Sequence, residues 1–211
     1  MCEIHNTIHG TVIVNGIEYN QYPSQSALIK ATENQWAIKL RDKGILRLSS
    51  IEYFQKLESD ELGDINEGQG LLRLNGNPMN MGSVNEVYIW CAALPNTPLD
   101  ILMRLSSNYD TIIKITDVEA FSKRISNALK TNGLNFHTHI GEVTYNHGEN
   151  VTRKQLNNQK WHFNVFQKRN EYSHQNEFRL TFTNIASRKI CKNHIEVSIG
   201  NCEDIVVIET T

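Results

Sequence analysis

The sequence contains few cysteines, and they form no recognisable site. The four, Cys2, Cys91, Cys191 and Cys202, include no CxxC pair and no spacing typical of zinc ligands. Cys91 lies in the apolar run VYIWCAAL, where a buried thiol behaves as a small hydrophobic side chain. These features argue against a zinc site and predict a reduced protein of the cytoplasm.

No excess of charge of either sign marks the chain. Lys and Arg number 21 and Asp and Glu number 23, which gives a formal net charge of -2. This balance provides no global basic field that would attract a nucleic acid or an anionic membrane. No apolar run reaches the length of a membrane span. We therefore expect no membrane partner.

The commonest catalytic and nucleotide-binding motifs are also missing. The sequence has no GxSxG, no Walker A motif and no GxGxxG. The histidines predict no metal site, because His137 and His139 would share one side of a strand without a third ligand at a suitable spacing. These absences exclude the commonest hydrolase, P-loop and Rossmann signatures.

The composition indicates one folded domain. Hydrophobic residues make up 39% of the 211 residues and charged residues 21%, which is enough apolar material for a core and too much for a disordered chain. We find no internal repeat, low-complexity linker or domain boundary, and predict a single domain over residues 1–211. Asn15-Gly16 between two β-rich runs predicts a hairpin, which we expect to form an N-terminal appendage over residues 1–22.

The stretch ALIKATENQWAIKLRDKGILRLSS predicts a strand, a helix and a second strand in succession. Residues 27–30 form the first strand, and Thr32 with Gln35 makes a capping box at the start of the helix. Gly44 ends the helix, and Ile45 begins the second strand.

The remaining elements change in character along the chain. We expect a short helix after residue 52 that leads into an acidic loop, a central strand over 86–93, a helix over 97–105, a strand over 111–115, a helix capped by Thr116 and ended by Gly133, and strands over 139–145, 162–168, 178–183, 194–199 and 205–208. Helices thus concentrate in the first two-thirds, and an antiparallel sheet in the last third. The pattern predicts an α+β fold.

Glu177 is the main candidate for chemistry, and Gln175 precedes it by two residues in NEYSHQNEFRL. The polar loop changes there into an alternating strand, so Glu177 and Arg179 share the face opposite Phe178. One interpretation is a Glu177–Arg179 ion pair on a solvated sheet face, which would contribute little. The other is a catalytic carboxylate at the rim of a sheet, whose replacement would abolish activity and leave the melting temperature nearly unchanged.

Other side chains are candidates for a metal or a planar ligand. Asp64 and Glu67 in GDINEGQG could bind a divalent cation through oxygen ligands, although the spacing is not that of an EF-hand, and a solvated acidic loop is the alternative. Tyr53, Tyr172 and Trp161 could line a pocket and stack on a planar ligand, although aromatic side chains in a core are the alternative.

Two stretches, KGILRLSSIEYFQKLESDELGDINEG and FNVFQKRNEYSHQNEFRL, together resemble a large uncharacterised domain family of bacteria and phages. That family combines a strand G-x-L-R-F/L-x-S, an aromatic segment, an acidic D-x-x-E-G and a late F-x-K…Y-x-x-Q-x-E-x-R. The matching positions here are Gly44, Leu46, Arg47, Ser49, Tyr53, Asp64, Glu67, Gly68, Phe166, Lys168, Tyr172, Gln175, Glu177 and Arg179. The resemblance covers most of the chain but implies no particular chemistry.

The order of parts also resembles the ADP-ribosyltransferases. Those enzymes have a strand with a basic or His residue, a helix, a strand with small hydroxyl residues and a late Q-x-E or E-x-E. Here Lys30 is on the first strand, Ser49-Ser50 follow the second, and Gln175-Asn176-Glu177 come late. Lys30 takes the place of the usual Arg or His, and Leu48-Ser49-Ser50-Ile51 that of a compact Ser-Thr-Ser.

The second resemblance implies a split antiparallel β-sheet and NAD as the substrate. Glu177 would bind the nicotinamide ribose and stabilise the oxocarbenium-like charge as nicotinamide leaves, by the electrostatic logic of a glycosidase carboxylate. Gln175 would orient the nucleophile. The remaining implied roles are NAD phosphate or ribose binding by Lys30, Arg47 and Ser49, and stacking on nicotinamide by Tyr53 or Tyr172.

The leading hypothesis is therefore an ADP-ribosyltransferase that modifies a protein, RNA or DNA, as a toxin or phage-defence effector with a possible antitoxin or inhibitor protein as partner. One alternative is a non-catalytic module of a defence or toxin–antitoxin system, in which Glu177 and Arg179 form a structural pair. Another is a metal-dependent nuclease or hydrolase with Asp64, Glu67 and Glu177 as ligands.

Overall fold

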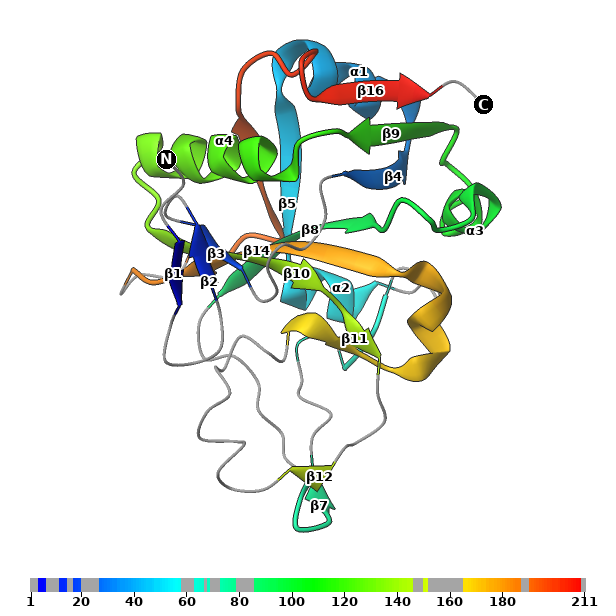
Figure 1. Cartoon of the computed structure of the whole chain (residues 1–211), viewed down its shortest axis with the longest axis vertical. Coiled ribbons are helices and arrows are strands. Elements are labelled where there is room, and N and C mark those ends of the chain that lie inside the picture. The colour runs from blue at the N-terminus through cyan, green and yellow to red at the C-terminus, as the bar shows by residue number, and fades with distance from the viewer. Residues whose placement is uncertain are drawn as a thin grey trace.

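The computed structural model describes residues 4–6, 12–14, 17–19, 27–57, 63–66, 68, 73–78, 86–145, 150–151, 165–186 and 190–209. It is a mixed α+β structure with a mostly antiparallel open sheet (Figure 1). The α-helices of the described chain all lie between residues 34 and 131. The predicted α+β class is confirmed.

The main sheet has 11 strands, and nine of them follow the order β1-β2-β3-β10-β14-β8-β4-β9-β16, with β5 and β15 off this path. Its strands are β1 (Ile4–Asn6), β2 (Val12–Val14), β3 (Ile17–Tyr19), β4 (Leu28–Thr32), β5 (Ile45–Ser50), β8 (Val87–Ala93), β9 (Thr111–Ile115), β10 (Phe136–Glu142), β14 (Glu177–Asn184), β15 (His194–Ser198) and β16 (Val206–Glu209). β2 and β3 pair antiparallel with Val14 opposite Ile17, which agrees with the predicted hairpin, and β3 joins the main sheet beside β10.

Five short strands form two small sheets. These are β6 (Arg73–Leu74), β7 (Asn77–Pro78) and β12 (Asn150–Val151) in one, and β11 (Thr144–Tyr145) and β13 (Gln167–Lys168) in the other. The β11–β13 pair is parallel and matches Tyr145 with Lys168. Both residues contact Glu177, so this pair brings them to the start of β14.

The main sheet branches at β8. One edge of β8 pairs with β14 along seven residues, from Val87 to Ala93. The other edge pairs with two strands in turn: Ile29 of β4 lies opposite Ala93, and Ser49 of β5 lies opposite Ile89. Beyond β8 the sheet therefore continues as two branches, β4-β9-β16 and β5-β15.

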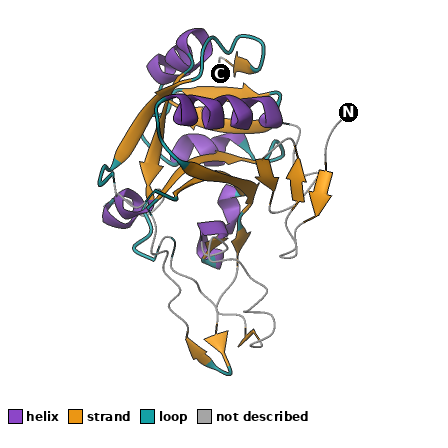
Figure 2. Cartoon of the chain, turned by 90° about the vertical axis from the view of Figure 1, so that its left-hand side faces the viewer, coloured by secondary structure: helices purple, strands orange, loops and turns teal. Residues whose placement is uncertain are grey.

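Helices lie on both sides of the central strands (Figure 2). They are α1 (Asn34–Lys43), α2 (Ile51–Lys56), α3 (Leu99–Arg104), α4 (Val118–Thr131) and the 3-10 helix η2 (Asn170–Gln175). The apolar stripes of α1 and α4 pack with Trp90, Phe178 and Leu180 in the largest core cluster. Trp90 and Phe121 of α4 have ring centroids 4.9 Å apart. The opposite face of β8 packs against α2 and α3.

The predicted strand over 139–145 is divided between β10 and β11, the predicted polar loop before Glu177 is the 3-10 helix η2, and the helix predicted over 97–105 is α3, from Leu99 to Arg104. The starts of α1 and α4 also differ from the predictions. The strand before α1 continues to Thr32, and Glu33 rather than Thr32 is the N-cap, without a side-chain capping bond. At α4 the N-cap is Asp117 rather than Thr116, and its carboxylate accepts a hydrogen bond from the Ala120 N–H. At α1 the Asn34 N–H donates instead to Asp110 Oδ1, which is distant in the chain, so the local pattern locates the start of the helix only to within a residue.

Gly44 is required by its conformation and by its surroundings. It ends α1 at φ 62 in the left-handed region, and a Cβ at this position would lie 1.9 Å from the Gly200 carbonyl oxygen. Gly133 has a similar φ of 72, but a Cβ there would meet no atom of the described residues within 4 Å. Replacement of Gly44 would therefore cause both backbone strain and steric overlap, whereas replacement of Gly133 would cause backbone strain alone.

We expect Gly44→Ala to lower the free energy of unfolding by more than about 3 kcal/mol, because left-handed strain and overpacking add. Gly133→Ala has only the strain and should cost about 1–2 kcal/mol. Urea unfolding of both variants checks this. Similar losses for the two would contradict the close approach of Gly44 and Gly200.

Candidate functional site

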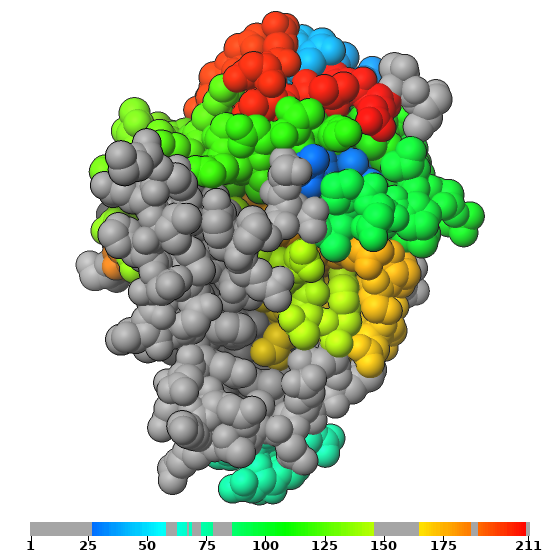
Figure 3. Space-filling model, in the orientation of Figure 1, coloured from blue at the N-terminus to red at the C-terminus, as the bar shows by residue number. Residues whose placement is uncertain are grey.

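A pocket of about 560 Å³, including its open mouth, lies where the two branches of the sheet meet β8. Its walls come from β4, β8 and β14 and from α2, α3 and the segment around η2, and α3, β4 and η2 adjoin on one face of the molecule (Figure 3). Most lining residues are apolar, and the polar ones are Lys30, Lys168, Gln175, Glu177 and Arg179.

The register between β14 and β8 turns Glu177 and Arg179 towards this pocket. Glu177 lies opposite Ala93, and Arg179 lies opposite Cys91. Side chains alternate along a strand, so Phe178 points into the main core on the other face. The predicted division of β14 into two faces is confirmed.

The carboxylate of Glu177 is held by two cations in a buried cluster. Arg179 donates from Nε to Oε1 at 2.7 Å and from Nη2 to Oε2 at 3.1 Å, and Lys168 Nζ donates to Oε2 at 3.1 Å. The exposed fractions are 7% for Glu177, 5% for Lys168 and 1% for Arg179. The predicted Glu177–Arg179 ion pair is confirmed, but the solvated face is wrong, because every residue of β14 is buried.

The cluster keeps Glu177 ionised. Burial alone would raise the pKa of the Glu177 carboxyl, but the charges of Arg179 and Lys168 and the hydrogen bonds from Arg179 outweigh it and hold the pKa well below its usual range. The neighbouring Cys91 behaves in the opposite way, because burial and the Glu177 charge raise the pKa of its thiol. Cys91 therefore stays protonated at neutral pH and is not a thiolate nucleophile.

The backbone of Glu177 is fixed by two residues that follow β10 in the chain. Its N–H donates to Tyr145 Oη at 2.7 Å, and its carbonyl accepts from the Val143 N–H at 2.9 Å. The preceding Asn176 has φ 41, in the left-handed region where Asn is among the better-tolerated residues. This turn separates Gln175 at the end of η2 from Glu177 at the start of β14. Both side chains nevertheless line the pocket.

Of the residues predicted to bind NAD, Lys30 is the one that lines the pocket. Its Nζ donates to the Cys91 carbonyl oxygen at 2.7 Å and lies 5.4 Å from the Trp90 ring centroid. Arg47 is exposed and packs over Trp36 at 5.1 Å. Ser49 lies on β5, outside the lining.

Neither of the two predicted stacking tyrosines is among the residues that line the pocket. Tyr53 meets the ring of Phe54 edge-on, with centroids 5.6 Å apart, and Phe54 is the lining residue. Tyr172 is buried beneath Lys168, whose Nζ lies 4.7 Å from its ring centroid. Trp161 lies outside the described residues. The aromatic lining residues are therefore Phe54 and Tyr109.

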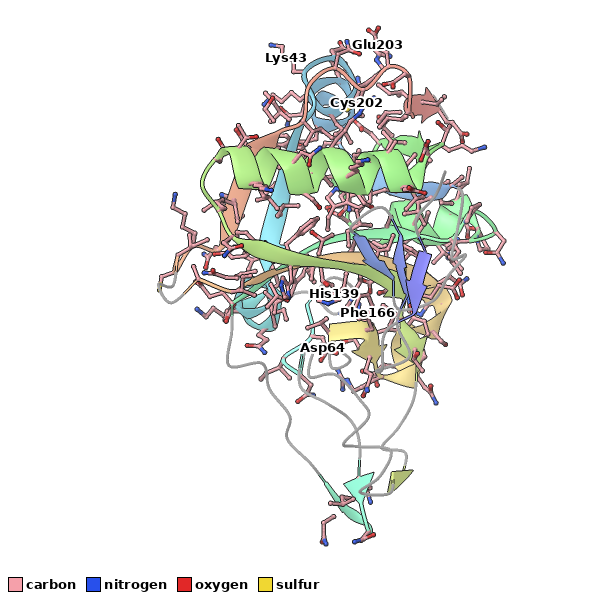
Figure 4. The ribbon with its side chains drawn as sticks, turned by 60° about the vertical axis from the view of Figure 1, so that its left-hand side comes forward. Lys43, Asp64, His139, Phe166, Cys202 and Glu203 are labelled. Atoms are coloured by element: carbon pink, nitrogen blue, oxygen red, sulfur yellow. The ribbon has the colours of Figure 1, made fainter. Side chains whose placement is uncertain are left out.

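The two stretches that carry the family resemblance meet behind the pocket. Asp64 is buried and accepts from Arg169 Nη2 at 3.3 Å, and Arg169 also donates to Tyr172 Oη at 3.1 Å. Tyr172 in turn donates to the Gly63 carbonyl oxygen at 3.3 Å. Figure 4 shows Asp64 on the side of the sheet opposite α4, the same side as Phe166. This network connects the acidic segment to Lys168 through the adjacent Arg169.

The described carboxylates do not gather as metal ligands. Asp64 is bound by Arg169, and Glu177 by Arg179 and Lys168. Across the residues that the structure describes, no three His, Cys, Asp or Glu side chains come together as a metal site requires. Glu67 lies outside those residues, so the predicted set cannot be placed in full.

No protein-family model, curated protein or solved structure matches the sequence at a significant level. Among the described helices, none is long and apolar enough to cross a membrane. The function is therefore inferred from the chemistry of the pocket.

Among the polar and aromatic lining residues, Lys168, Phe54 and Tyr109 were not singled out from the sequence as site residues in their own right. Lys168 was visible as part of the F-x-K motif, and Phe54 adjoins the candidate Tyr53. Tyr109 follows α3 in a loop and has no local sequence signal, because only the packing of α3 against β4 brings it to the pocket.

Because Glu177 is buried between two cations, its replacement affects folding whatever its function. The expectation of a nearly unchanged melting temperature is therefore revised. We predict that Glu177→Gln lowers the free energy of unfolding by about 3–5 kcal/mol at neutral pH, because it leaves two buried cations without a carboxylate.

The same residue predicts how stability depends on pH. The folded pKa of Glu177 lies below its unfolded value of about 4.3, so its contribution is complete above that pH and is lost as the pH falls towards the folded pKa. Wild type should therefore lose more stability than Glu177→Gln between about pH 6 and pH 3. Urea unfolding at both pH values measures this, and equal losses would show that Glu177 is not the group responsible.

Proposed function

We propose that this protein is an ADP-ribosyltransferase that uses NAD, with Glu177 as the catalytic carboxylate. The observation that carries the proposal is an ionised glutamate on the wall of a partly open pocket, two residues after a buried glutamine that lines the same pocket. The branching of the sheet at β8 agrees with the split sheet that the resemblance implies.

The charge of the pocket suits both parts of the reaction. Departure of nicotinamide leaves positive charge on the ribose, which an ionised carboxylate in a low-dielectric site stabilises. Glu177 is such a group, because its cation partners keep it ionised despite burial. The pocket lining has one carboxylate and three cationic side chains, those of Lys30, Lys168 and Arg179. This excess of positive charge also suits an anionic diphosphate.

We assign the stacking role to the aromatic residues that line the pocket. Phe54 on α2 and Tyr109 after α3 provide apolar rings for stacking on a planar group. Tyr53 supports Phe54, and Tyr172 supports Lys168. Lys30 keeps its proposed role towards the phosphates or ribose, whereas Arg47 and Ser49 would act on a part of the substrate outside the pocket.

The acceptor is a macromolecule: a protein, an RNA or a DNA. A transferase of this kind fits a toxin or a phage-defence effector, with an antitoxin or inhibitor protein as a possible partner. The class of acceptor that becomes labelled with ADP-ribose in the following experiment identifies the target.

The central experiment measures nicotinamide release and transfer of labelled ADP-ribose by purified protein, with cell lysate, RNA and DNA offered as acceptors. We expect Glu177→Gln to lower the rate by at least about 100-fold, because the charge that stabilises the transition state is lost. The matched control is Glu86→Gln. Glu86 is also 7% exposed and accepts hydrogen bonds from Asn184 and the Ile190 N–H, but it lies outside the pocket lining.

Glu86→Gln is expected to lose stability without a comparable loss of rate at a temperature where both variants are folded. If the two variants lose activity in parallel with their stability, the loss reports unfolding and Glu177 is not the catalytic group. If wild type leaves NAD intact with every acceptor, the transferase is ruled out under those conditions.

The aromatic assignment gives a separate prediction. Tyr109→Ala should raise the KM for NAD by about tenfold, the loss expected from removing one aromatic contact of about 1–1.5 kcal/mol. Tyr53→Ala should have a smaller effect on KM, because Tyr53 contacts Phe54 but does not line the pocket. Initial rates over a range of NAD concentrations decide between them. A larger effect from Tyr53 would restore it as the stacking residue.

A non-catalytic ligand-binding module is the second candidate. It is favoured by the engagement of both Glu177 oxygens, which already accept hydrogen bonds from Arg179 and Lys168. The Cys91 thiol is a further hydrogen-bonding neighbour of this carboxylate, so a substrate hydroxyl at Glu177 would share or displace one of these donors. Binding of NAD without turnover would identify this module, and turnover that depends on Glu177 would exclude it.

A further inference from the structure

One ammonium group contacts both residues of the Gln175–Glu177 pair. Lys168 Nζ donates to Gln175 Oε1 at 2.8 Å and to Glu177 Oε2 at 3.1 Å. The three side chains are 5%, 5% and 7% exposed, in the order Lys168, Gln175, Glu177, and all three line the pocket. The left-handed turn at Asn176 separates the backbones of Gln175 and Glu177, and Lys168 reconnects their side chains.

The contact with Lys168 determines which way the Gln175 amide faces. An ammonium group has donors and no acceptor, so the amide oxygen must face Lys168 and the amide nitrogen must face away from it. Towards any other group, Gln175 can then act mainly as a donor. A ligand atom that meets the Gln175 nitrogen must accept a hydrogen bond, as hydroxyl, carbonyl and phosphate oxygens do.

Lys168 is itself held by two separate parts of the structure. Its strand, β13, pairs with β11, where Tyr145 lies opposite Lys168 and also accepts from the Glu177 N–H. Its ammonium lies over the Tyr172 ring, which the Asp64–Arg169 network fixes from behind. The ammonium thus has a defined position independent of any ligand.

We propose that Lys168 is the positioning residue of this pocket, which sets the orientation of the Gln175 amide and the place of the Glu177 carboxylate through one bridging ammonium group. This inference rests on the proposed function for its catalytic consequence. Its structural part, the bridge, can be tested without turnover.

The groups around Glu177 determine how far its ionised form should lose stabilisation when Lys168 is replaced. Arg179 faces the carboxylate from the same strand, Lys168 from β13 and the neutral Cys91 from β8. The Tyr145 hydroxyl reaches the Glu177 backbone from β11, and Lys30 enters the pocket from β4. Without Lys168, Glu177 keeps the Arg179 ion pair and loses only part of its stabilisation.

The first measurement is a carbon-13 NMR titration of the Glu177 side-chain carboxyl, assigned by its absence in Glu177→Gln. Wild type should remain ionised to the lowest pH at which the protein is folded. Lys168→Met should move the titration to higher pH, because one of two cation partners is lost. Lys168→Arg retains the charge and should restore most of the wild-type behaviour. Lys30→Met removes another pocket lysine that donates to the Cys91 carbonyl, and should leave the titration in place.

The second measurement is NAD turnover by the same variants. Lys168→Met should lower kcat by about 100-fold, the effect of a small misplacement of the reacting groups, with a smaller change in KM. The acid limb of the pH dependence of kcat for Lys168→Met should move to higher pH, in parallel with the NMR titration of Glu177. Lys30→Met should act mainly on KM.

An unshifted titration in Lys168→Met, or an equal shift in Lys30→Met, would overturn the bridge. If the titration shifts as expected but wild type does not turn over NAD, the bridge stands and the transferase fails. If Lys168→Met does not fold, Lys168→Gln, which keeps a polar head group, replaces it in both measurements with the same expected directions.

Discussion

A buried carboxylate between two cations is the constraint on which this site depends. Removing Glu177, Lys168 and Arg179 from water is costly unless each charge is paired and hydrogen-bonded with good geometry. The protein meets this requirement with a two-point contact from Arg179 and a third from Lys168. The β14–β8 register, the β11–β13 pair and η2 must all be in place for the three side chains to meet.

The same constraint gives the pocket its chemical character. A buried glutamate without partners would take up a proton, and its neutral acid could not stabilise positive charge. The cation partners prevent this, so the carboxylate stays ionised although it is buried. The branch in the sheet at β8 leaves space for a ligand beside that carboxylate, and α2 and α3 supply its apolar walls.

Local sequence patterns predicted the local part of this arrangement. Alternation along 177–182 placed Glu177 and Arg179 on one face, and Gly44 was identified as the end of a helix. The patterns could not show that this face is buried, because its cover comes from residues distant in the chain. The contacts of Lys168 depend on the parallel pairing of β11 with β13, and Tyr109 is brought to the pocket by the packing of α3. Such long-range contacts have no local periodicity.

The motifs of the family resemblance have a structural explanation in this molecule. Asp64 of the acidic segment binds Arg169, beside Lys168, and Tyr172 bonds back to Gly63. Gly68 has φ 69, and a Cβ there would lie 2.9 Å from Ile51 on α2, so this glycine permits close packing of the segment against α2. The acidic segment thus supports the pocket from behind, and its carboxylate at position 64 has a supporting role.

The most direct test of the catalytic assignment is a crystal structure of the complex with an NAD analogue whose nicotinamide–ribose bond cannot be cleaved. We predict the analogue in the pocket, with a ribose hydroxyl at Glu177 Oε1, an acceptor atom at the Gln175 amide nitrogen and a planar ring between Phe54 and Tyr109. An analogue bound elsewhere, or with its ribose away from Glu177, would contradict the assignment of this pocket as the catalytic site.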